Sequence, residues 1–247
     1  MLGDLPIDRY VKLQLMFEEV GTHMRAQLDS LHCRFDPTPG VQFRKLGARY
    51  TEEPGVDIFD DEEIKRAIMQ EVCCELIHEG ITSLYRNVDQ FTSLGNYDHY
   101  EERNDLYSPT GASIYPKLKT AFEKAVLLHG YQPWAIVSTA VLSALRTHGA
   151  FSKENISDLY CPLKYMGVHL GVRVYVDQFS HRNEPVIFGG KESLSYQADS
   201  FIEYGGHRMD PNTFEQTHSF LSRFRINHNP TKLYAMKVKF ASLGCFL

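Results

Sequence analysis

The chain has 247 residues, enough for one large domain or two small ones, and 43% are apolar and 12% aromatic. Such a composition can bury a substantial core, which excludes disorder throughout the chain. The formal net charge of −5 argues against a protein that binds nucleic acid or anionic lipid through its overall charge. No apolar run approaches the roughly 18 residues that span a bilayer, and the first residues show no secretory pattern. We therefore expect a soluble, unexported protein without a membrane partner.

The first expected element is an amphipathic helix over residues 8–32, because apolar side chains recur there at steps of three and four. Pro37, Pro39 and Gly40 prevent its continuation. Residues 41–56 then alternate only weakly between apolar and polar side chains and begin with basic residues. This pattern predicts an exposed two-stranded excursion, which needs a neighbour to order it because it carries few apolar side chains of its own.

A second, longer helix is expected from residue 60 to residue 88. Asp60 with Glu63 three positions later forms a capping-box pattern, and apolar residues keep helical spacing from Ile64 onwards. At 1.5 Å per residue such a helix is about 40 Å long, which suggests a beam rather than a filler of the core. The polar residues 91–113 that follow are expected to form a loop or a domain boundary.

The central part of the chain predicts a helix, a strand and another helix. Residues 114–128 have the spacing of an amphipathic helix, and Gly130 stands at the position expected just past its end. Residues 134–137 are short and apolar, which favours a buried strand, and Ser138 is a suitable N-cap for a helix that stops at Gly149.

The remainder of the chain is dominated by strand signals. Residues 172–176 alternate strictly, residues 186–188 form a short apolar run that ends at two glycines, and the last forty residues again alternate. Helices and strands therefore mix without a regular βαβ repeat. The expected fold class is α+β.

No motif for catalysis, metal binding or cofactor binding is found. Gly189-Gly190-Lys191-Glu192-Ser193 is only superficially similar to a phosphate-binding loop, because Pro185 and Glu192 stand where glycine and Ser or Thr are required. We interpret it as a tight turn between strands. The eleven histidines lack metal-ligand spacing, and the five cysteines have no framework of disulfide or zinc spacing, so we expect reduced thiols. A hydrolase that uses Cys161 with His169 or His207 is an alternative, although no local pattern activates that thiol.

Four stretches of the second half, in this order, carry a resemblance to a known family. The first runs from Trp134 through the predicted strand and helix to Phe151, and the second contains Leu163 to Gly167 followed by a strand that ends in Tyr175-Val176-Asp177. The third is a strand with a Gly-Gly-Lys turn, Val186 to Lys191. The fourth is Met209-Asp210-Pro211-Asn212-Thr213-Phe214, leading to Arg223-Phe224 and Asn229-Pro230.

These stretches resemble the major capsid proteins of tailed bacteriophages, particularly the T-even-like branch, which have the Hong Kong 97-type phage capsid fold. The similarity covers about residues 60–240, because the predicted long helix stands where the spine helix of that family belongs. The resemblance implies an N-terminal arm and extended loop over residues 1–59 and a peripheral domain with the spine helix over 60–105. It further implies an axial domain over 106–206 and return strands of the peripheral domain over 207–247. Residues 210–214 would lie where the chain crosses back to the peripheral domain.

The resemblance implies a non-enzymatic function. The chain would be a structural subunit that assembles with itself, as hexamers and pentamers, into an icosahedral or prolate shell around packaged double-stranded DNA. It would be located in the virion after assembly in the host cytoplasm, with scaffold, portal and decoration proteins as further partners. The acidic balance fits a container that does not bind DNA tightly. Residues 41–56 would lie over a neighbouring copy, where Arg44, Lys45 and Arg49 would face acidic partners. The expected contacts between subunits are Gln42, Phe43, Arg44, Lys45 and Arg49.

Three alternatives stay open. The chain could be the vertex subunit of the same family, which forms pentamers only. It could instead be an encapsulin-like shell around an enzyme cargo, or the small cytosolic hydrolase considered above.

Overall fold

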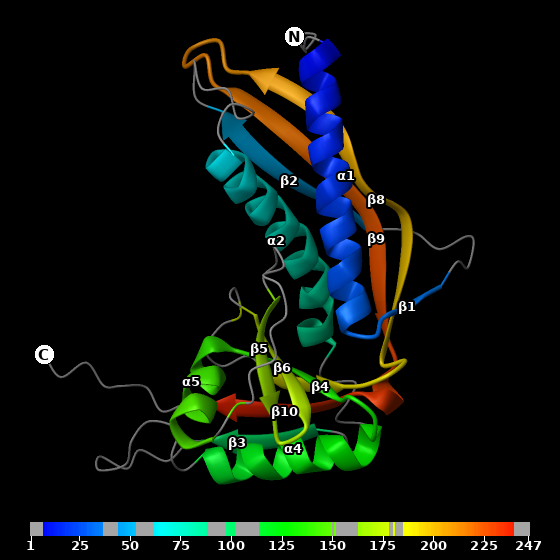
Figure 1. Cartoon of the computed structure of the whole chain (residues 1–247), viewed down its shortest axis with the longest axis vertical. Coiled ribbons are helices and arrows are strands. Elements are labelled where there is room, and N and C mark those ends of the chain that lie inside the picture. Colours follow the sequence, from blue (N-terminus) through cyan, green and yellow to red (C-terminus); the bar gives the residue numbers. More distant parts are fainter. Residues whose placement is uncertain are drawn as a thin grey trace, which may run out of the picture.

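The computed structural model describes residues 7–36, 44–52, 62–87, 97–101, 114–149, 151, 163–177, 180 and 185–239. The molecule is elongated, with one sheet and two long helices at one end and a second sheet with two shorter helices at the other (Figure 1). The α+β class predicted from the sequence is confirmed. In chain order the elements are α1 (Ile7–Ser30), β1 (Arg34–Phe35), β2 (Arg44–Glu52), α2 (Glu62–Arg86), β3 (Tyr97–Glu101), α4 (Tyr115–His129), β4 (Trp134–Val137), α5 (Thr139–His148), β5 (Leu163–His169), β6 (Val172–Asp177), β7 (Val186–Gly189), β8 (Leu194–Met209), β9 (Gln216–His228), the 3₁₀ helix η1 (Pro230–Lys232) and β10 (Tyr234–Lys239).

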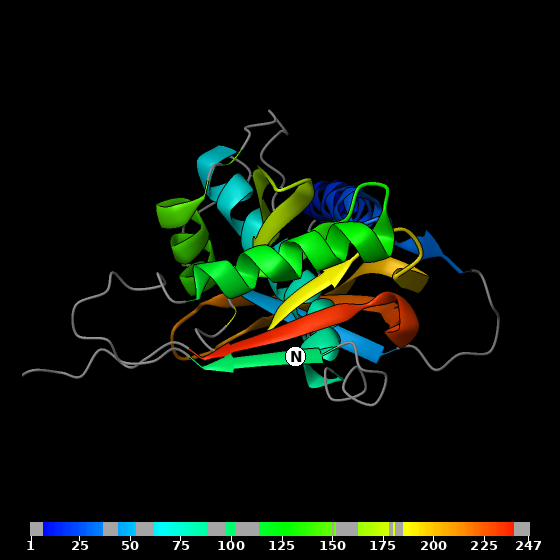
Figure 2. The ribbon, with the colours of Figure 1, turned by 90° about the horizontal axis from the view of Figure 1, so that it is seen from below.

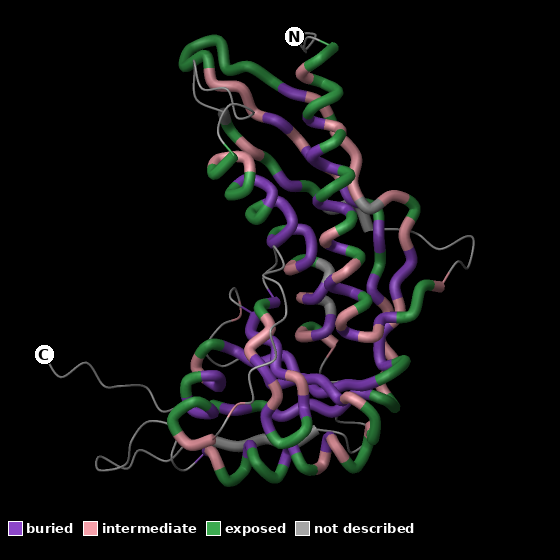
Figure 3. The backbone as a smooth tube through the Cα atoms, viewed as in Figure 1, coloured by how far each residue is buried: buried purple, intermediate pink, exposed green. Residues whose placement is uncertain are grey.

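The first sheet has four strands in the order β1-β8-β9-β2. Strands β8 and β9 form a long antiparallel hairpin, and β2 pairs antiparallel with the outer side of β9. Helices α1 and α2 lie over one face of this sheet, where the predicted apolar stripes are buried (Figure 3). Phe17 of α1 packs on Phe220 of β9 with ring centroids 4.2 Å apart. The apolar stripes of both long helices contribute to this core, so α2 fills the core as well as spanning the length that suggested a beam.

The second sheet has six strands in the order β3-β10-β7-β4-β6-β5. Every residue of β4 and β7 is buried, because the sheet is covered on both sides. Helix α4 lies across the strands on one side (Figure 2), with Phe122 edge-to-face against Phe188 at 5.1 Å. Trp134 and Ile136 of β4 belong instead to the core beneath α1 and α2. The second sheet thus lies between two hydrophobic layers.

The local signals at helix ends are present where the structure describes them. The Ser138 hydroxyl accepts a hydrogen bond from the Val141 amide at 3.3 Å, as an N-cap does. Gly130 ends α4 with φ of 64°, and its amide donates to the Val126 carbonyl at 2.8 Å. Asp60 of the predicted capping box lies outside the described residues.

Two expectations about elements were wrong, and one strand was not predicted. Residues 44–52 are one strand paired along its whole length with β9 of the same chain, so they do not form a free two-stranded excursion. Residues 97–101 of the expected loop form β3, which pairs in parallel with β10. Residues 194–209, whose polar composition gave no strand signal, form the longest strand of the molecule. Each of these strands forms because it pairs with a strand from another part of the sequence. Local periodicity does not reveal such pairing.

The order of the strands shows which sheet each segment of the chain joins. The boundary expected at residue 206 falls inside β8, which belongs to the four-stranded sheet throughout. The chain passes between the sheets at residues 190–193 and again at 229–233. Strand β10 lies in the six-stranded sheet, so residues 207–247 do not all return to the same unit. The Asp210-Pro211-Asn212-Thr213-Phe214 string is the tip of the β8–β9 hairpin, not a crossing between units.

Candidate assembly surfaces and the joint between the sheets

The basic residues that the sequence singled out are located on the edge strand β2. Arg44, Lys45 and Arg49 lie in this strand, whereas Gln42 and Phe43 lie outside the described residues. Ala48 is buried against the core, and Arg49 next to it is exposed on the face of the sheet opposite the helices. Alternation along a strand places position 45 on the same outer face as Arg49 and position 44 on the helix side. Of the side chains in the predicted basic group, the structure describes that of Arg49.

The outer face of the four-stranded sheet is polar and charged. Arg223 of β9 lies 3.6 Å from the carboxylates of both Asp199 and Glu203 of β8. All three side chains are largely exposed, so these ion pairs contribute little to stability. Arg225 and Arg49 are exposed on this face as well. No helix covers this face among the elements that the structure describes.

Helix α2 has an acidic row on its solvent side. Glu71, Glu75 and Glu79 follow one another at steps of four residues, and all three are exposed. Partial burial, followed by repulsion from Glu71 and Glu79, raises the pKa of Glu75 above its ordinary value. Within the described residues, none of the three carboxylates has a cationic partner. We call this group the α2 acidic row; its spacing is visible in the sequence, although the sequence analysis did not single it out.

Apolar side chains are also exposed at both ends of the molecule. Ile7, Val11 and Leu15 recur every fourth residue on the outer side of α1 and are 83%, 49% and 60% exposed. Phe214 at the tip of the β8–β9 hairpin is 64% exposed. Leu127 near the end of α4 is 86% exposed. Single exposed apolar residues are ordinary, but a stripe along one helix face is a feature of surfaces that bind a partner.

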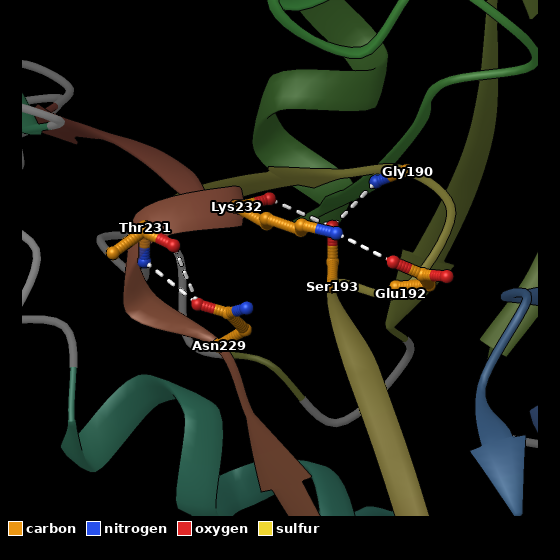
Figure 4. Close-up of polar contacts among 6 residues, drawn as sticks. All are labelled: Gly190, Glu192, Ser193, Asn229, Thr231 and Lys232. Atoms are coloured by element: carbon orange, nitrogen blue, oxygen red, sulfur yellow. Dashed lines mark hydrogen bonds and ion pairs between the residues drawn. The ribbon is translucent and has the colours of Figure 1, made fainter.

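Two of the chain's passages between the sheets, residues 190–193 and 229–233, lie side by side and are joined at Ser193, which is fully buried (Figure 4). The Ser193 hydroxyl accepts from the Gly190 amide at 2.8 Å and donates to the Lys232 carbonyl at 2.7 Å. The Asn229 amide donates to the Ser193 carbonyl at 2.9 Å, and the Lys232 ammonium lies 2.6 Å from the Glu192 carboxylate. This pairing lowers the pKa of Glu192. The Gly189–Ser193 segment is a tight turn, as predicted.

Two cavities flank this joint and share Arg34 and Glu192. One has a volume of about 320 Å³, and the other, of about 450 Å³, is also lined by Lys191 and Asp29. Positive and negative side chains balance within them, so neither cavity has the excess of one charge that would select an ionic ligand.

No family model and no curated protein matches the chain. Solved structures are similar to it. A virus-like particle from Pyrococcus furiosus aligns with a TM-score of 0.47 and 12% identity, over 90% of this chain and 99% of that chain. The procapsid of satellite phage P4, including its size determination protein, aligns with a TM-score of 0.48 and 10% identity, over 85% and 86%. The holo encapsulin complex of Synechococcus elongatus aligns with a TM-score of 0.43 and 8% identity, over 79% and 73%.

The residues of the hydrolase alternative do not come together in the described structure. Cys161 lies outside the described residues. His169 packs edge-to-face on Phe122 in the six-stranded region, whereas His207 lies on β8 opposite His218, in the other sheet. Burial raises the pKa of Cys33 and, with the neighbouring Cys73, raises that of Cys74 to about 12, so both thiols are held in the unreactive protonated form.

Among the residues that the structure describes, no three His, Cys, Asp or Glu side chains are grouped closely enough to hold a metal ion. In the same residues, no helix is both long and apolar enough to cross a membrane.

Proposed function

We propose that the chain is a structural subunit that assembles with copies of itself into a closed shell, with the Hong Kong 97-type capsid fold that its sequence resembles. One observation carries the proposal: the four-stranded sheet is covered by helices on one face only, and among the described residues no further strand pairs with the free side of β2. An open edge of this length pairs readily with another chain. Identical copies provide such a partner, and homo-oligomers close by symmetry.

In the finer form of this proposal the chain is a major capsid protein of a tailed bacteriophage. Hexamers and pentamers of it would form the shell around packaged double-stranded DNA, in a virion assembled in the host cytoplasm. The six-stranded unit would be the axial domain, and the four-stranded unit with the spine helix α2 would be the peripheral domain. Scaffold, portal and decoration proteins would be further partners. The first three sequence stretches described above support this assignment, whereas the fourth forms the tip of the β8–β9 hairpin.

The contact that we propose between subunits joins opposite charges. Arg49, with Lys45 on the same face of β2 by alternation, would lie over the α2 acidic row of a neighbouring copy. Glu71, Glu75 and Glu79 have no cationic partner among the described residues, and partial burial together with repulsion from Glu71 and Glu79 raises the pKa of Glu75. Cations placed over them would relieve that repulsion. Complementary charges of this kind also select the partner and its orientation.

Imaging of the purified protein by negative-stain electron microscopy tests the function directly. We expect closed particles of uniform size. A protein that stays monomeric at high concentration would remove the basis of the proposal. The symmetry of the particles separates the alternatives, since a vertex subunit would form isolated pentamers and a compartment protein would enclose enzyme cargo instead of DNA.

Charge reversal tests the proposed contact. Arg49→Glu and Glu75→Arg should each reduce the yield of particles, and the double variant should recover it because the opposite charges are exchanged. Arg146→Glu on the exposed face of α5 makes the same charge change away from both surfaces and serves as a control. Full assembly of both single variants would exclude this contact and leave self-assembly itself intact.

Binding to DNA is the third test. We expect the free subunit to show no strong retardation of double-stranded DNA at low salt, because an acidic chain gains little from the release of counterions. Tight binding that weakens steeply with added salt would contradict a shell that merely encloses its DNA.

A further inference from the structure

The two long edges of the four-stranded sheet differ in regularity. Strand β2 pairs with β9 over nine consecutive residues without a register shift. Strand β8 has three irregularities, after Ala198, Ser200 and Tyr204, and carries two adjacent glycines. Bulges and glycines bend an edge and protect it from pairing. Of these two edges, β2 is therefore the one suited to accept another strand.

The sequence of β2 is complementary to itself when it is read in the opposite direction. About Ala48 as the centre, Arg44 at one end corresponds to Glu52 at the other. An antiparallel pair of β2 strands centred on Ala48 thus places a cation opposite an anion at both ends. The full set of opposed positions is Arg44 with Glu52, Lys45 with Thr51, Leu46 with Tyr50, Gly47 with Arg49, and Ala48 with itself.

We propose that the β2 edge pairs antiparallel with β2 of a second copy, around a two-fold axis that passes between the two Ala48 residues. The two four-stranded sheets then become one eight-stranded sheet. The proposal rests on the self-assembly proposed above and specifies one of its contacts. A two-fold contact of this kind is isologous, because the same surface is used on both copies. The affinity comes from backbone hydrogen bonds along the edge, as in other cases of strand addition.

Side-chain charges distinguish this register from its neighbours. A shift by two residues in one direction would place Lys45 opposite Arg49 of the second copy, twice in each pair. A shift by two in the other direction would place Arg49 opposite itself. Like charges directly opposite each other are destabilising, whereas opposite charges contribute roughly 0.2–1 kcal/mol for each pair. The register centred on Ala48 also uses all nine residues of the strand.

Shifts by one residue are excluded by the faces of the sheet. Ala48 lies on the helix side of β2, where it is 2% exposed. The centred register keeps α1 and α2 of both copies on the same face of the joined sheet, because opposed residues share a face. A slip by one residue would turn the second copy over and place its helices on the opposite face. The centred register therefore makes a continuous layer of helices, whereas registers that differ from it by one residue do not.

Charge exchange across the two-fold axis is the first test. Arg44→Glu and Glu52→Arg should each weaken self-association about tenfold, because two attractive pairs become two repulsive ones, and the Arg44→Glu/Glu52→Arg double variant should restore it. Lys45→Glu/Glu52→Arg is the matched control: it makes the same net change of charge but leaves Arg44 opposite an arginine, so it should not recover. Equilibrium sedimentation measures the association. Equal recovery by both double variants would overturn the register.

Cysteine cross-linking is the second test, and it uses the open outer face. Gly47 and Arg49 of the second copy are opposed, so an oxidised mixture of Gly47→Cys and Arg49→Cys copies should give covalent dimers, whereas neither variant alone should. Strands in such a pair place opposed Cα atoms about 4.5–5.5 Å apart, within the range of a disulfide. A side chain at position 47 meets only ordinary contacts, with the Phe220 carbonyl at 3.6 Å and a Leu221 methyl at 3.8 Å. The wild-type chain with its native cysteines is the control.

The outcomes separate this proposal from the function on which it rests. Dimers from Gly47→Cys alone or from Arg49→Cys alone would identify one of the shifted registers and overturn the centred one. Suppose that particles form although the cysteine mixture gives no covalent dimers and the charge variants associate like the wild type. In that case the β2 edge is not a contact between copies, and the proposal of self-assembly is unaffected. A monomer under all conditions overturns both.

Discussion

The two sheets of this protein differ in how many of their faces are covered. In the six-stranded sheet, β4 and β7 are buried along their whole length because hydrophobic layers lie on both sides. In the four-stranded sheet, β9 alternates between buried and more exposed positions, since helices cover one face only. The six-stranded sheet therefore has its apolar surface buried within the chain. The four-stranded sheet leaves one face and one regular edge available to another molecule, which is why assembly surfaces are proposed there.

Glycine substitutions should give the largest difference in folding stability between the two sheets. A Cβ atom at Gly189 of β7 would lie 2.2 Å from the ring of Trp134, which is fully buried. Because that ring has no free space to enter, Gly189→Ala should destabilise the fold by about 3 kcal/mol or more. Gly47→Ala in β2 meets only ordinary contacts and should change stability by less than about 1 kcal/mol. Chemical denaturation measures both, and equal losses would contradict the contrast between the sheets.

The joint between the sheets should show the next largest effect. Ser193→Ala removes the hydroxyl that links the Gly190 amide to the Lys232 carbonyl. We expect a loss of about 2 kcal/mol, because two backbone groups lose their partner in a buried position. Thr120→Ala removes an exposed hydroxyl that bonds its own helix and is the control. A thermal melt in which the Ser193 variant behaves like this control would show that the hydroxyl does not hold the joint.

The α2 acidic row should give a small effect of the opposite sign. The pKa of Glu75 is raised in the folded state, so the folded chain holds this proton more tightly than the unfolded chain, and stability falls as pH rises through the raised pKa. Glu75→Gln removes the repulsion and should raise the melting temperature by about 1–3 °C near pH 7. The gain should shrink towards about pH 4, where carboxylates become protonated. A gain that is the same at both pH values would rule out repulsion as its cause.

The sequence predicted the elements whose signals are local. The spacing of apolar residues placed α1, α2 and α4 within a few residues of their observed ends, and Ser138 and Gly130 act at helix ends as expected. It did not predict β3 or β8, because their pairing depends on strands far away in the chain.

The candidate surfaces were predicted only in part. The basic group was located in part on a strand that is paired within the chain, and of its side chains the structure describes that of Arg49. The α2 acidic row was readable from three glutamates at steps of four, but its exposure required the packing of α2 against the sheet. The self-complementary pattern of β2 can be read from the sequence. It indicates a contact only because the sheet order places β2 at an edge.

The β8–β9 hairpin has a mechanical consequence. Its pairing begins at Leu194 and His228, directly beside Ser193 and Asn229, and continues to Met209 and Gln216 at the tip. At about 3.3 Å per residue the 16 residues of β8 form an arm roughly 50 Å long. A force applied at Phe214 therefore exerts a torque at the foot of the arm, where the Asn229 backbone amide is hydrogen-bonded to Ser193. The joint at Ser193 and the packing of α1 and α2 along the hairpin together determine how far the tip can tilt.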